Sequence, residues 1–187
     1  MPPKAKITRE MILDAAFEIV RNKGAENINA RTVSQELGCS TQPVMYHFKT
    51  IGELKKAVYA KADKYHSEYI TAICGENPMK GIGLNYIRFA ATEKNLFRFL
   101  FQSNEFSEKN ISELINAAEL QPIIAVLSRE AAVNAEQAKV IFRPLFLIVH
   151  GYASMHANNQ MTYDEQTILA DLDLVFNGAV CAARGGL

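Results

Sequence analysis

The chain has 187 residues and a mass of 20.8 kDa, and 49% of its residues are apolar and 21% charged. This composition supplies enough apolar material for a folded core and excludes an intrinsically disordered chain. Twenty lysines and arginines balance twenty acidic residues, so the formal net charge of zero excludes a protein that coats nucleic acid with basic residues.

A first amphipathic helix is predicted near the N-terminus. Apolar residues recur at the spacing of one helix face from Ile12 to Val20, and Thr8 is placed to cap the start of this helix. Arg21 forms part of a cationic last turn, which the stop signal Gly24 closes.

Two short helices are predicted within residues 29–48. The first runs from about residue 31 to 37, and the second begins after Ser40 and ends near residues 47–49. Between them, Gly38 suits the positive φ of a helix end, and Ser40 is a residue type that caps a helix start. The apolar residues spaced to pack inward are Val33, Leu37, Val44 and Phe48. The pattern predicts a helix-turn-helix, whose second helix can lie in the major groove of DNA.

The remainder of the chain is predicted to be helical as well. A long helix is expected from about Ile51 to Ile73, and further helices are expected at residues 80–92, 94–102, 110–133, 136–158 and 164–183. Pro122 and Pro144 fall inside two of these and are expected to kink or interrupt them. Because no stretch alternates like a half-buried strand, the predicted fold class is all-α, a three-helix head and a C-terminal helical bundle with about nine helices in total.

The zero net charge hides an asymmetry along the chain. Residues 1–61 carry ten lysines and arginines and six acids, a net charge of +4, and residues 62–187 carry −4. This split fits a basic, anion-binding module attached to an acidic body, although a difference of this size also arises by chance.

The cysteines and apolar runs indicate where the protein resides. Cys39, Cys74 and Cys181 are far apart and odd in number, which favours reduced thiols over a disulfide framework. The longest apolar runs are shorter than the roughly 20 residues that span a bilayer, and the N-terminus lacks the apolar core of a secretory signal. The sequence therefore predicts a soluble, cytoplasmic protein.

The second helix of the helix-turn-helix carries side chains that suit DNA. Gln42 lies at its N-terminal end, the part that enters a groove, and glutamine can make two hydrogen bonds to adenine. Lys49 can meet a phosphate, and Arg31 can meet a phosphate or a guanine edge. The candidate DNA-binding residues are Arg31, Ser40, Thr41, Gln42, Pro43, Tyr46, His47 and Lys49.

A set of residues between positions 7 and 60 carries a family signature. These residues are Ile12, Ala15, Ala16, Phe17, Gly24, Val33, Leu37, Gly38, Cys39, Ser40, Tyr46, His47, Phe48, Lys49 and Leu54. Together they resemble the DNA-binding domain of the tetracycline-repressor (TetR) family of bacterial transcription regulators. The chain departs from the family at Met45, where a tyrosine often contacts phosphate, and at Ala30, where a threonine often does so.

The resemblance implies a DNA-binding domain at residues 6–62 and a ligand-binding and dimerisation domain at residues 63–187. It also implies a homodimeric, ligand-responsive transcriptional regulator, a repressor that a small molecule releases from a palindromic operator in double-stranded DNA. Beyond the head, the likeness is limited to Phe97 with Phe101 and to residues 148–152.

Aromatic residues in the C-terminal part predict either a ligand pocket or an ordinary helical core. The candidate pocket residues are Tyr86, Phe89, Phe97, Phe101, Phe142 and His150, and this set favours a largely apolar effector. His150 and His156 are six residues apart, a poor spacing for two ligands on one helix face, so neither a metal site nor a cofactor is predicted.

The last two helices are, by the family resemblance, the expected dimer interface, and the alternative is that they close the core of the monomer. The candidate interface residues are Leu169, Leu172, Val175, Phe176 and Ala179. Dimerisation has an independent argument, because one head reads too few bases for useful specificity. A two-fold dimer reads half-sites about 34–36 Å apart.

A second interpretation is a small-molecule-binding helical protein, or an enzyme, whose head does not bind DNA. The polar residues Thr41, Gln42 and Tyr46 at groove-facing positions argue against it. An enzyme is disfavoured because the sequence shows no paired carboxylates, nucleophile motif or Gly-rich phosphate loop. His47 likewise has no partner placed by a motif to orient it for catalysis.

Overall fold

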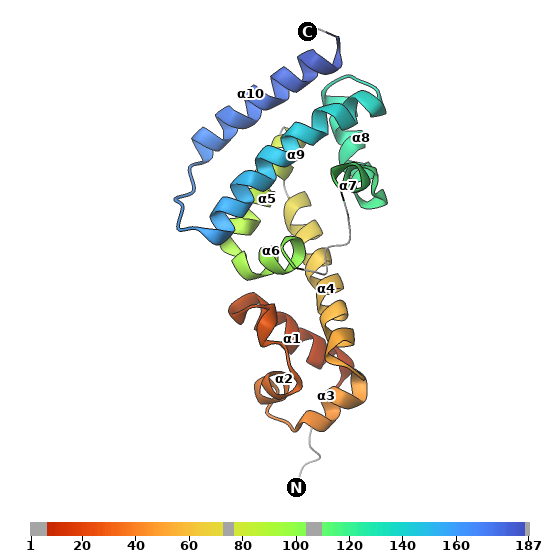
Figure 1. The fold of residues 1–187 in the computed structure, drawn as a ribbon, viewed down its shortest axis with the longest axis vertical. Coiled ribbons are helices and arrows are strands. Elements are labelled where there is room, and N and C mark those ends of the chain that lie inside the picture. The colour runs from red at the N-terminus through yellow and green to blue at the C-terminus, as the bar shows by residue number, and fades with distance from the viewer. Residues whose placement is uncertain (1–6, 73–76, 104–109, 186–187) are drawn as a thin grey trace. The chain divides into compact units, whose positions relative to one another are not determined.

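Every regular element in the described part of the chain is a helix (Figure 1). The structure, a computed structural model, describes residues 7–72, 77–103 and 110–185. Its helices are α1 (Arg9–Lys23), α2 (Ala30–Glu36), α3 (Thr41–His47), α4 (Ile51–Thr71), α5 (Pro78–Thr92), α6 (Lys94–Phe101), α7 (Ile111–Asn116), α8 (Gln121–Glu130), α9 (Ala135–Asn158) and α10 (Glu165–Ala183). The predicted all-α class is confirmed.

The two internal prolines act differently on their helices. The helix predicted at residues 110–133 is divided into α7 and α8, and Pro122 lies in the first turn of α8, where its missing N–H removes no hydrogen bond. Pro144 lies inside α9, which continues past it, so of the expected kink or interruption the interruption does not occur there. The predicted end of the long helix at Ile73 lies outside the described residues.

The chain divides into two compact units. The N-terminal unit comprises residues 1–66 and 93–106, so it contains α1 to α3, most of α4, and α6. The C-terminal unit comprises residues 67–92 and 107–187 and contains the end of α4, α5 and α7 to α10. Helix α6 therefore packs with the head, although it lies between elements of the other unit in the sequence.

The core of the N-terminal unit lies along one face of α1. Thr8 caps this helix as predicted, because its side chain accepts a hydrogen bond from the N–H of Met11 at 3.2 Å. Ile12 and Val20 are fully buried, as are Phe48 at the end of α3 and Phe97 on α6. The apolar helix face that predicted α1 from the sequence is thus the face that packs against α2, α3 and α6.

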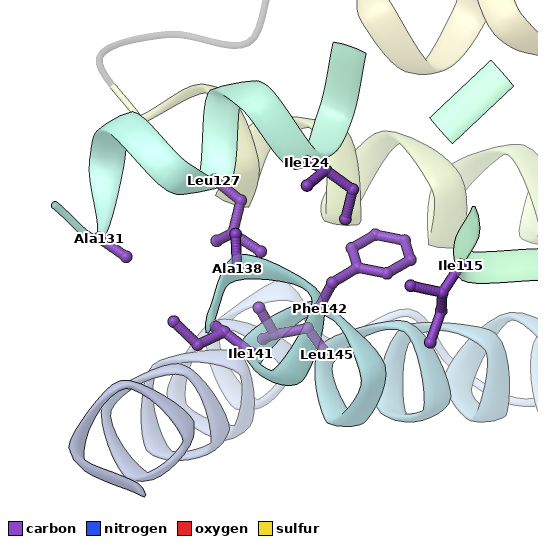
Figure 2. Packing of buried hydrophobic residues seen from close by; sticks show 8 residues of the cluster. All are labelled: Ile115, Ile124, Leu127, Ala131, Ala138, Ile141, Phe142 and Leu145. Carbon is purple, nitrogen blue, oxygen red and sulfur yellow. The ribbon is translucent and has the colours of Figure 1, made fainter. Parts of the chain in front are cut away.

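In the C-terminal unit, α9 packs against α5, α8 and α10. Figure 2 shows the part of this core where the ring of Phe142 extends from α9 between Ile124 on α8 and Ile115 on α7. The buried members of this cluster are Ile115, Ile124, Leu127, Ala131, Ala138, Ile141, Phe142 and Leu145. Helix α9 is therefore the central element of the bundle.

A buried histidine in the N-terminal unit makes its stability depend on pH. His66 on α4 is 6% exposed, and its ring meets that of Phe101 edge-on with centroids 5.1 Å apart. Burial lowers the pKa of His66 from 6.5 to about 4. In the unfolded chain the imidazole binds a proton as the pH falls below 6.5, whereas the folded chain does not until about pH 4, so stability is lost as the pH falls through that window.

We predict that urea unfolding titrations at pH 7.5 and pH 5.0 reveal how much His66 contributes to the pH dependence of the unfolding free energy. The wild-type chain should lose about 2 kcal/mol more unfolding free energy between these pH values than His66→Leu, which cannot titrate. Met161→Leu, a change at an exposed residue that does not titrate, is the matched control and should keep the wild-type pH dependence. Equal pH dependence in the wild type and His66→Leu would contradict the assignment.

Candidate nucleic-acid interface

The two short helices form the predicted helix-turn-helix, and local hydrogen bonds set their ends. The Asn29 side chain accepts hydrogen bonds from the N–H groups of Arg31 and Thr32, both at 3.0 Å, and the Thr32 hydroxyl accepts from the N–H of Asn29, which completes a capping box. Gly38 follows α2 with φ of +62°, as its place in the turn predicts. Ser40 precedes α3 as expected, but its side chain makes no capping hydrogen bond, so that part of the prediction is wrong.

Packing fixes which side of α3 faces outward. Val33 on α2, Val44 on α3 and Phe48 after it are all fully buried, whereas Leu37 is only partly buried. Because successive residues of a helix point about 100° apart, burial of Val44 turns the residues on either side of it away from the core. The inward packing of these apolar positions therefore presents the opposite face of α3 to solvent.

The outward face of α3 carries most of the predicted DNA-binding side chains. Thr41 and Gln42 are exposed, and so is Ser40 before them. Tyr46 is 81% exposed, which is unusual for an aromatic side chain in a folded domain. Met45 is 42% exposed beside it, so one of the two residues that depart from the family pattern lies on the same open surface.

The remaining predicted contacts lie around this face. Arg31 and Lys49 are exposed, and Pro43 is partly buried. His47 is also partly buried, and its Nε2 lies 3.1 Å from the carbonyl oxygen of Ile7. His47 therefore links the end of α3 to the chain that enters α1, and only part of its ring is available to DNA.

The structure places one cation beside this surface that the sequence does not predict. The guanidinium of Arg9, the first residue of α1, lies over the ring of Phe48 with 4.5 Å to the ring centroid. Arg9 gives no signal in the sequence because α1 and the end of α3 are 39 residues apart. It adds a positive charge over Phe48, the residue before the exposed Lys49.

The candidate pocket residues do not form a single cluster. Tyr86, Phe142 and His150 lie in the C-terminal unit, where Phe146 bridges them. The Phe146 ring stacks on Phe142 at 5.8 Å and on His150 at 5.5 Å between centroids, and Tyr86 meets it edge-on at 6.4 Å. Phe142, Phe146 and His150 are spaced four residues apart on α9, so they form one row along that helix.

The other candidate pocket residues lie elsewhere. Phe89 is fully buried on α5, where Tyr69 meets it edge-on at 5.3 Å. Phe97 and Phe101 belong to α6 in the N-terminal unit, and their rings are 5.1 Å apart. Phe97 is fully buried, as a core side chain would be.

A polar pair lies within the aromatic row. The hydroxyl of Tyr86 and Nδ1 of His150 are 2.9 Å apart. Burial raises the pKa of Tyr86 and lowers that of His150, so both side chains are neutral near pH 7. A neutral tyrosine and a neutral imidazole can each donate or accept a hydrogen bond. They can therefore bind a ligand's hydroxyl or carbonyl group without burying a charge.

The last two helices expose apolar side chains. On α9, Val140 is 53%, Leu147 56% and Met155 41% exposed, and on α10 Leu174 is 73% exposed. By length and composition alone, α10 is long and apolar enough to cross a bilayer, although the uninterrupted apolar runs of the sequence are shorter. Only 11% of its most apolar window is buried. The same properties are typical of a helix that a second protein chain covers.

The predicted interface residues lie mostly on the inner side of α10. Leu172 is 4% exposed, and Val175, Phe176 and Ala179 pack against the core cluster of α7 to α9, while Leu169 is partly buried. The helical positions that face outward instead include Leu174 and Gly178. Apart from the neighbouring backbone of α10 itself, no described atom lies within 4 Å of the place where a side chain would start at Gly178.

No group of three or more potential metal ligands occurs among the described residues.

An ion pair that the sequence does not predict joins Arg21 at the end of α1 to Glu93 before α6. The hydrogen bonds that Arg21 donates to Glu93 raise the pKa of Arg21 further above its usual high value.

Comparisons with known proteins agree with these features. No family model matches the chain. Over 73 residues, 39% of the chain, it is 27% identical to the class D tetracycline repressor of Escherichia coli and to the class H tetracycline repressor of Photobacterium damsela subsp. piscicida. The match covers only about a third, 34%, of the length of each of these relatives.

Two solved structures share the fold over most of their length. The multidrug binding protein EbrR, crystallised with imidazole, matches 89% of this chain and 88% of its own with a TM-score of 0.54 and 19% identity. NalD, the secondary repressor of the MexAB-OprM multidrug efflux pump in Pseudomonas aeruginosa, matches 91% and 96% with a TM-score of 0.52 and 18% identity. In its fold and in the matched part of its sequence, the chain thus resembles the TetR-family regulators, as its helix-turn-helix residues predict.

Proposed function

We propose that this chain is a DNA-binding transcriptional regulator that acts in the cytoplasm as a ligand-released repressor. The observation that carries the proposal is the face of α3, where Thr41, Gln42 and Tyr46 are exposed. On the opposite side of the helix, Val44 is buried in the core. A solvent-facing row of polar and aromatic side chains on the second helix of a helix-turn-helix suits contact with base edges and phosphates.

The α3 face supports a division of roles in the proposed complex. Thr41 and Gln42, at the start of α3, contact base edges in the major groove, and Gln42 is the residue suited to an adenine. Tyr46, one turn later, packs against the sugar-phosphate backbone. Arg31 and Lys49 at the flanks neutralise phosphates, so the affinity is expected to fall steeply as the salt concentration rises.

We infer that the regulator is a homodimer joined through the outer faces of α9 and α10. Leu147 and Leu174 are large apolar side chains that lie mostly in water in the single chain. Pairing these two helices with their copies would bury the side chains in a four-helix arrangement, to which Gly151 and Gly178 add room for close approach. Two heads related by a two-fold axis then read a palindrome with half-sites about 34–36 Å apart.

The proposed effector is a small, largely apolar molecule bound in the C-terminal unit. Tyr86, Phe146 and His150 offer aromatic surface with one neutral polar pair, which fits an uncharged aromatic compound carrying a hydroxyl or carbonyl group. The description of EbrR as a multidrug binding protein is consistent with such a ligand. The effector would favour a conformation in which the heads no longer match the operator, with α4 as the continuous helix through both units.

The DNA-binding proposal is tested with duplexes selected from a random-sequence pool by the purified protein. Gln42→Ala is expected to weaken binding to the selected duplex about tenfold to a hundredfold, since a good base contact contributes about 1–3 kcal/mol of discrimination. Tyr46→Ala is expected to weaken binding to the selected duplex and to unrelated duplexes alike, because a backbone contact does not depend on the base sequence. Fluorescence anisotropy at several salt concentrations measures the affinities, and sedimentation confirms an unchanged oligomeric state.

Gln160→Ala is the matched control, because this exposed glutamine lies between α9 and α10. It should bind the selected duplex like the wild type. If the wild-type protein selects no duplex at low salt, or if Gln42→Ala binds as tightly as Gln160→Ala, the proposed role of α3 is wrong.

A further inference from the structure

The N-terminal unit contains a buried carboxylate that holds an arginine in a fixed orientation. The guanidinium of Arg21 donates to Glu93 through Nε, 3.1 Å from Oε1 and 2.9 Å from Oε2, and through Nη2, 2.5 Å from Oε1. The Glu93 side chain is only 10% exposed, and the Arg21 side chain is 38% exposed. A planar guanidinium that contacts both oxygens of a carboxylate fixes direction as well as distance, which a single point charge does not.

Two further side chains complete this arrangement. The hydroxyl of Tyr65 on α4 donates to Oε1 of Glu93 at 3.2 Å, and the Arg21 guanidinium lies 5.7 Å from the centroid of the Tyr65 ring. Asn95 in the first turn of α6 donates from Nδ2 to the carbonyl oxygen of Arg21 at 3.1 Å. That carbonyl belongs to the last turn of α1, where carbonyl groups lack partners within the helix. We call Arg21, Tyr65, Glu93 and Asn95 the Arg21 cluster.

The cluster lies where the chain enters and leaves the head. The N-terminal unit ends its first segment at His66, one residue after Tyr65, and resumes at Glu93. The same hydrogen bonds therefore tie the last turn of α1 to both of these points in the chain. Helix α1 in turn packs directly against α2 and α3, so the cluster joins both of these points to the helix that supports the helix-turn-helix.

We propose that Arg21, Tyr65 and Glu93 are positioning residues for DNA binding, which hold the helix-turn-helix in a fixed orientation on the segments that continue into the C-terminal unit. In the dimer, this connection sets the distance between the two heads. The inference rests on the proposed function, and it adds to that function a group of residues that contacts neither DNA nor effector. Its consequence is that loosening the cluster harms two-headed binding without harming one head.

The test compares a selected palindromic duplex with a half-site duplex in which the other half is scrambled. For the wild type, simultaneous binding of both heads should favour the palindrome by a factor on the order of 10². In Arg21→Gln and in Glu93→Gln this ratio should fall about tenfold, a typical size for coupling between sites, while half-site affinity stays near that of the control. Insertion of one base pair between the half-sites, about 3.4 Å, should weaken the wild type more than either variant.

The pair of variants separates positioning from electrostatics. Arg21→Gln removes a positive charge and Glu93→Gln removes a negative one, so a long-range charge effect on DNA would move their affinities in opposite directions. The matched control is Lys23→Gln, which removes a positive charge from the same helical turn. The Lys23 side chain is 61% exposed, and its Nζ lies 3.9 Å from Oε2 of Glu36. Its palindrome-to-half-site ratio should equal that of the wild type.

Tyr65→Phe provides a milder variant that keeps the ring packed edge-on against Phe17. Loss of the hydrogen bond to Glu93 should lower the ratio about threefold. Equal ratios in the wild type, Arg21→Gln, Glu93→Gln and Tyr65→Phe would overturn the proposal while the proposed function stands. The same holds if half-site and palindrome affinities fall together, which would show a merely structural role. If the wild type binds no duplex, the proposed function fails, and the inference fails with it.

Discussion

Leu174→Asp is expected to convert the dimer into a monomer that binds a palindromic duplex about a hundredfold more weakly, because the second head no longer binds from an already anchored molecule. Leu174 is 73% exposed on α10, the most exposed of the large aliphatic side chains in the described residues. At the centre of a helix–helix interface, an aspartate would have to bury an unpaired charge, whereas on a free surface the same substitution would have little effect.

Sedimentation equilibrium and anisotropy on palindrome and half-site duplexes measure this prediction. Half-site affinity should be unchanged, because Leu174 belongs to the C-terminal unit. Met161→Asp, an equivalent change at a 44% exposed position outside α9 and α10, is the control and should remain dimeric. A dimeric Leu174→Asp protein would place the interface elsewhere.

Phe48→Ala is expected to destabilise the N-terminal unit by about 3–5 kcal/mol, the usual cost of deleting a buried phenylalanine ring and leaving a cavity. Phe48 is fully buried directly after α3, its N–H bonds the carbonyl oxygen of Val44, and Arg9 lies over its ring. Loss of the ring removes the support for α3 and α1 together, so DNA binding should be lost in parallel with the folded population.

Urea unfolding and amide hydrogen exchange measure the loss, and exchange should increase most in α2 and α3. Met45→Ala, three residues earlier and 42% exposed, should change the unfolding free energy by no more than about 0.5 kcal/mol. A loss below about 1 kcal/mol in Phe48→Ala would mean that the head does not depend on this ring.

The helix-turn-helix was predictable because its information is local. The periodicity around Val33 and Val44 and the glycine in the turn both act over a few residues, and the structure contains both of them. Ser40 was the exception, because a residue type that often caps a helix does not show whether its hydroxyl forms the hydrogen bond.

The grouping of the aromatic residues was not predictable in the same way. Phe97 and Phe101 read like Phe142 and Phe146, since both pairs are spaced four residues apart on apolar helices. Only the packing of α6 with the head separates the two pairs, because contacts between distant segments decide which apolar face meets which. For the same reason, the pattern along α10 identified an apolar helix but did not show that Leu172 is buried while Leu174 lies in water.

The sequence alone therefore determined the all-α class, the helix-turn-helix and the residues of its outward face, because helix periodicity, capping and turn chemistry are local properties. Only the tertiary structure brought Arg21, Tyr65 and Glu93 together, since Glu93 lies 72 residues after Arg21 in the chain. An ion pair of this kind leaves no periodic signal, because a single arginine and a single glutamate at that separation are common in any folded domain. Its existence depends on how α1, α4 and α6 pack, and this packing holds the carboxylate where the arginine can reach both of its oxygens.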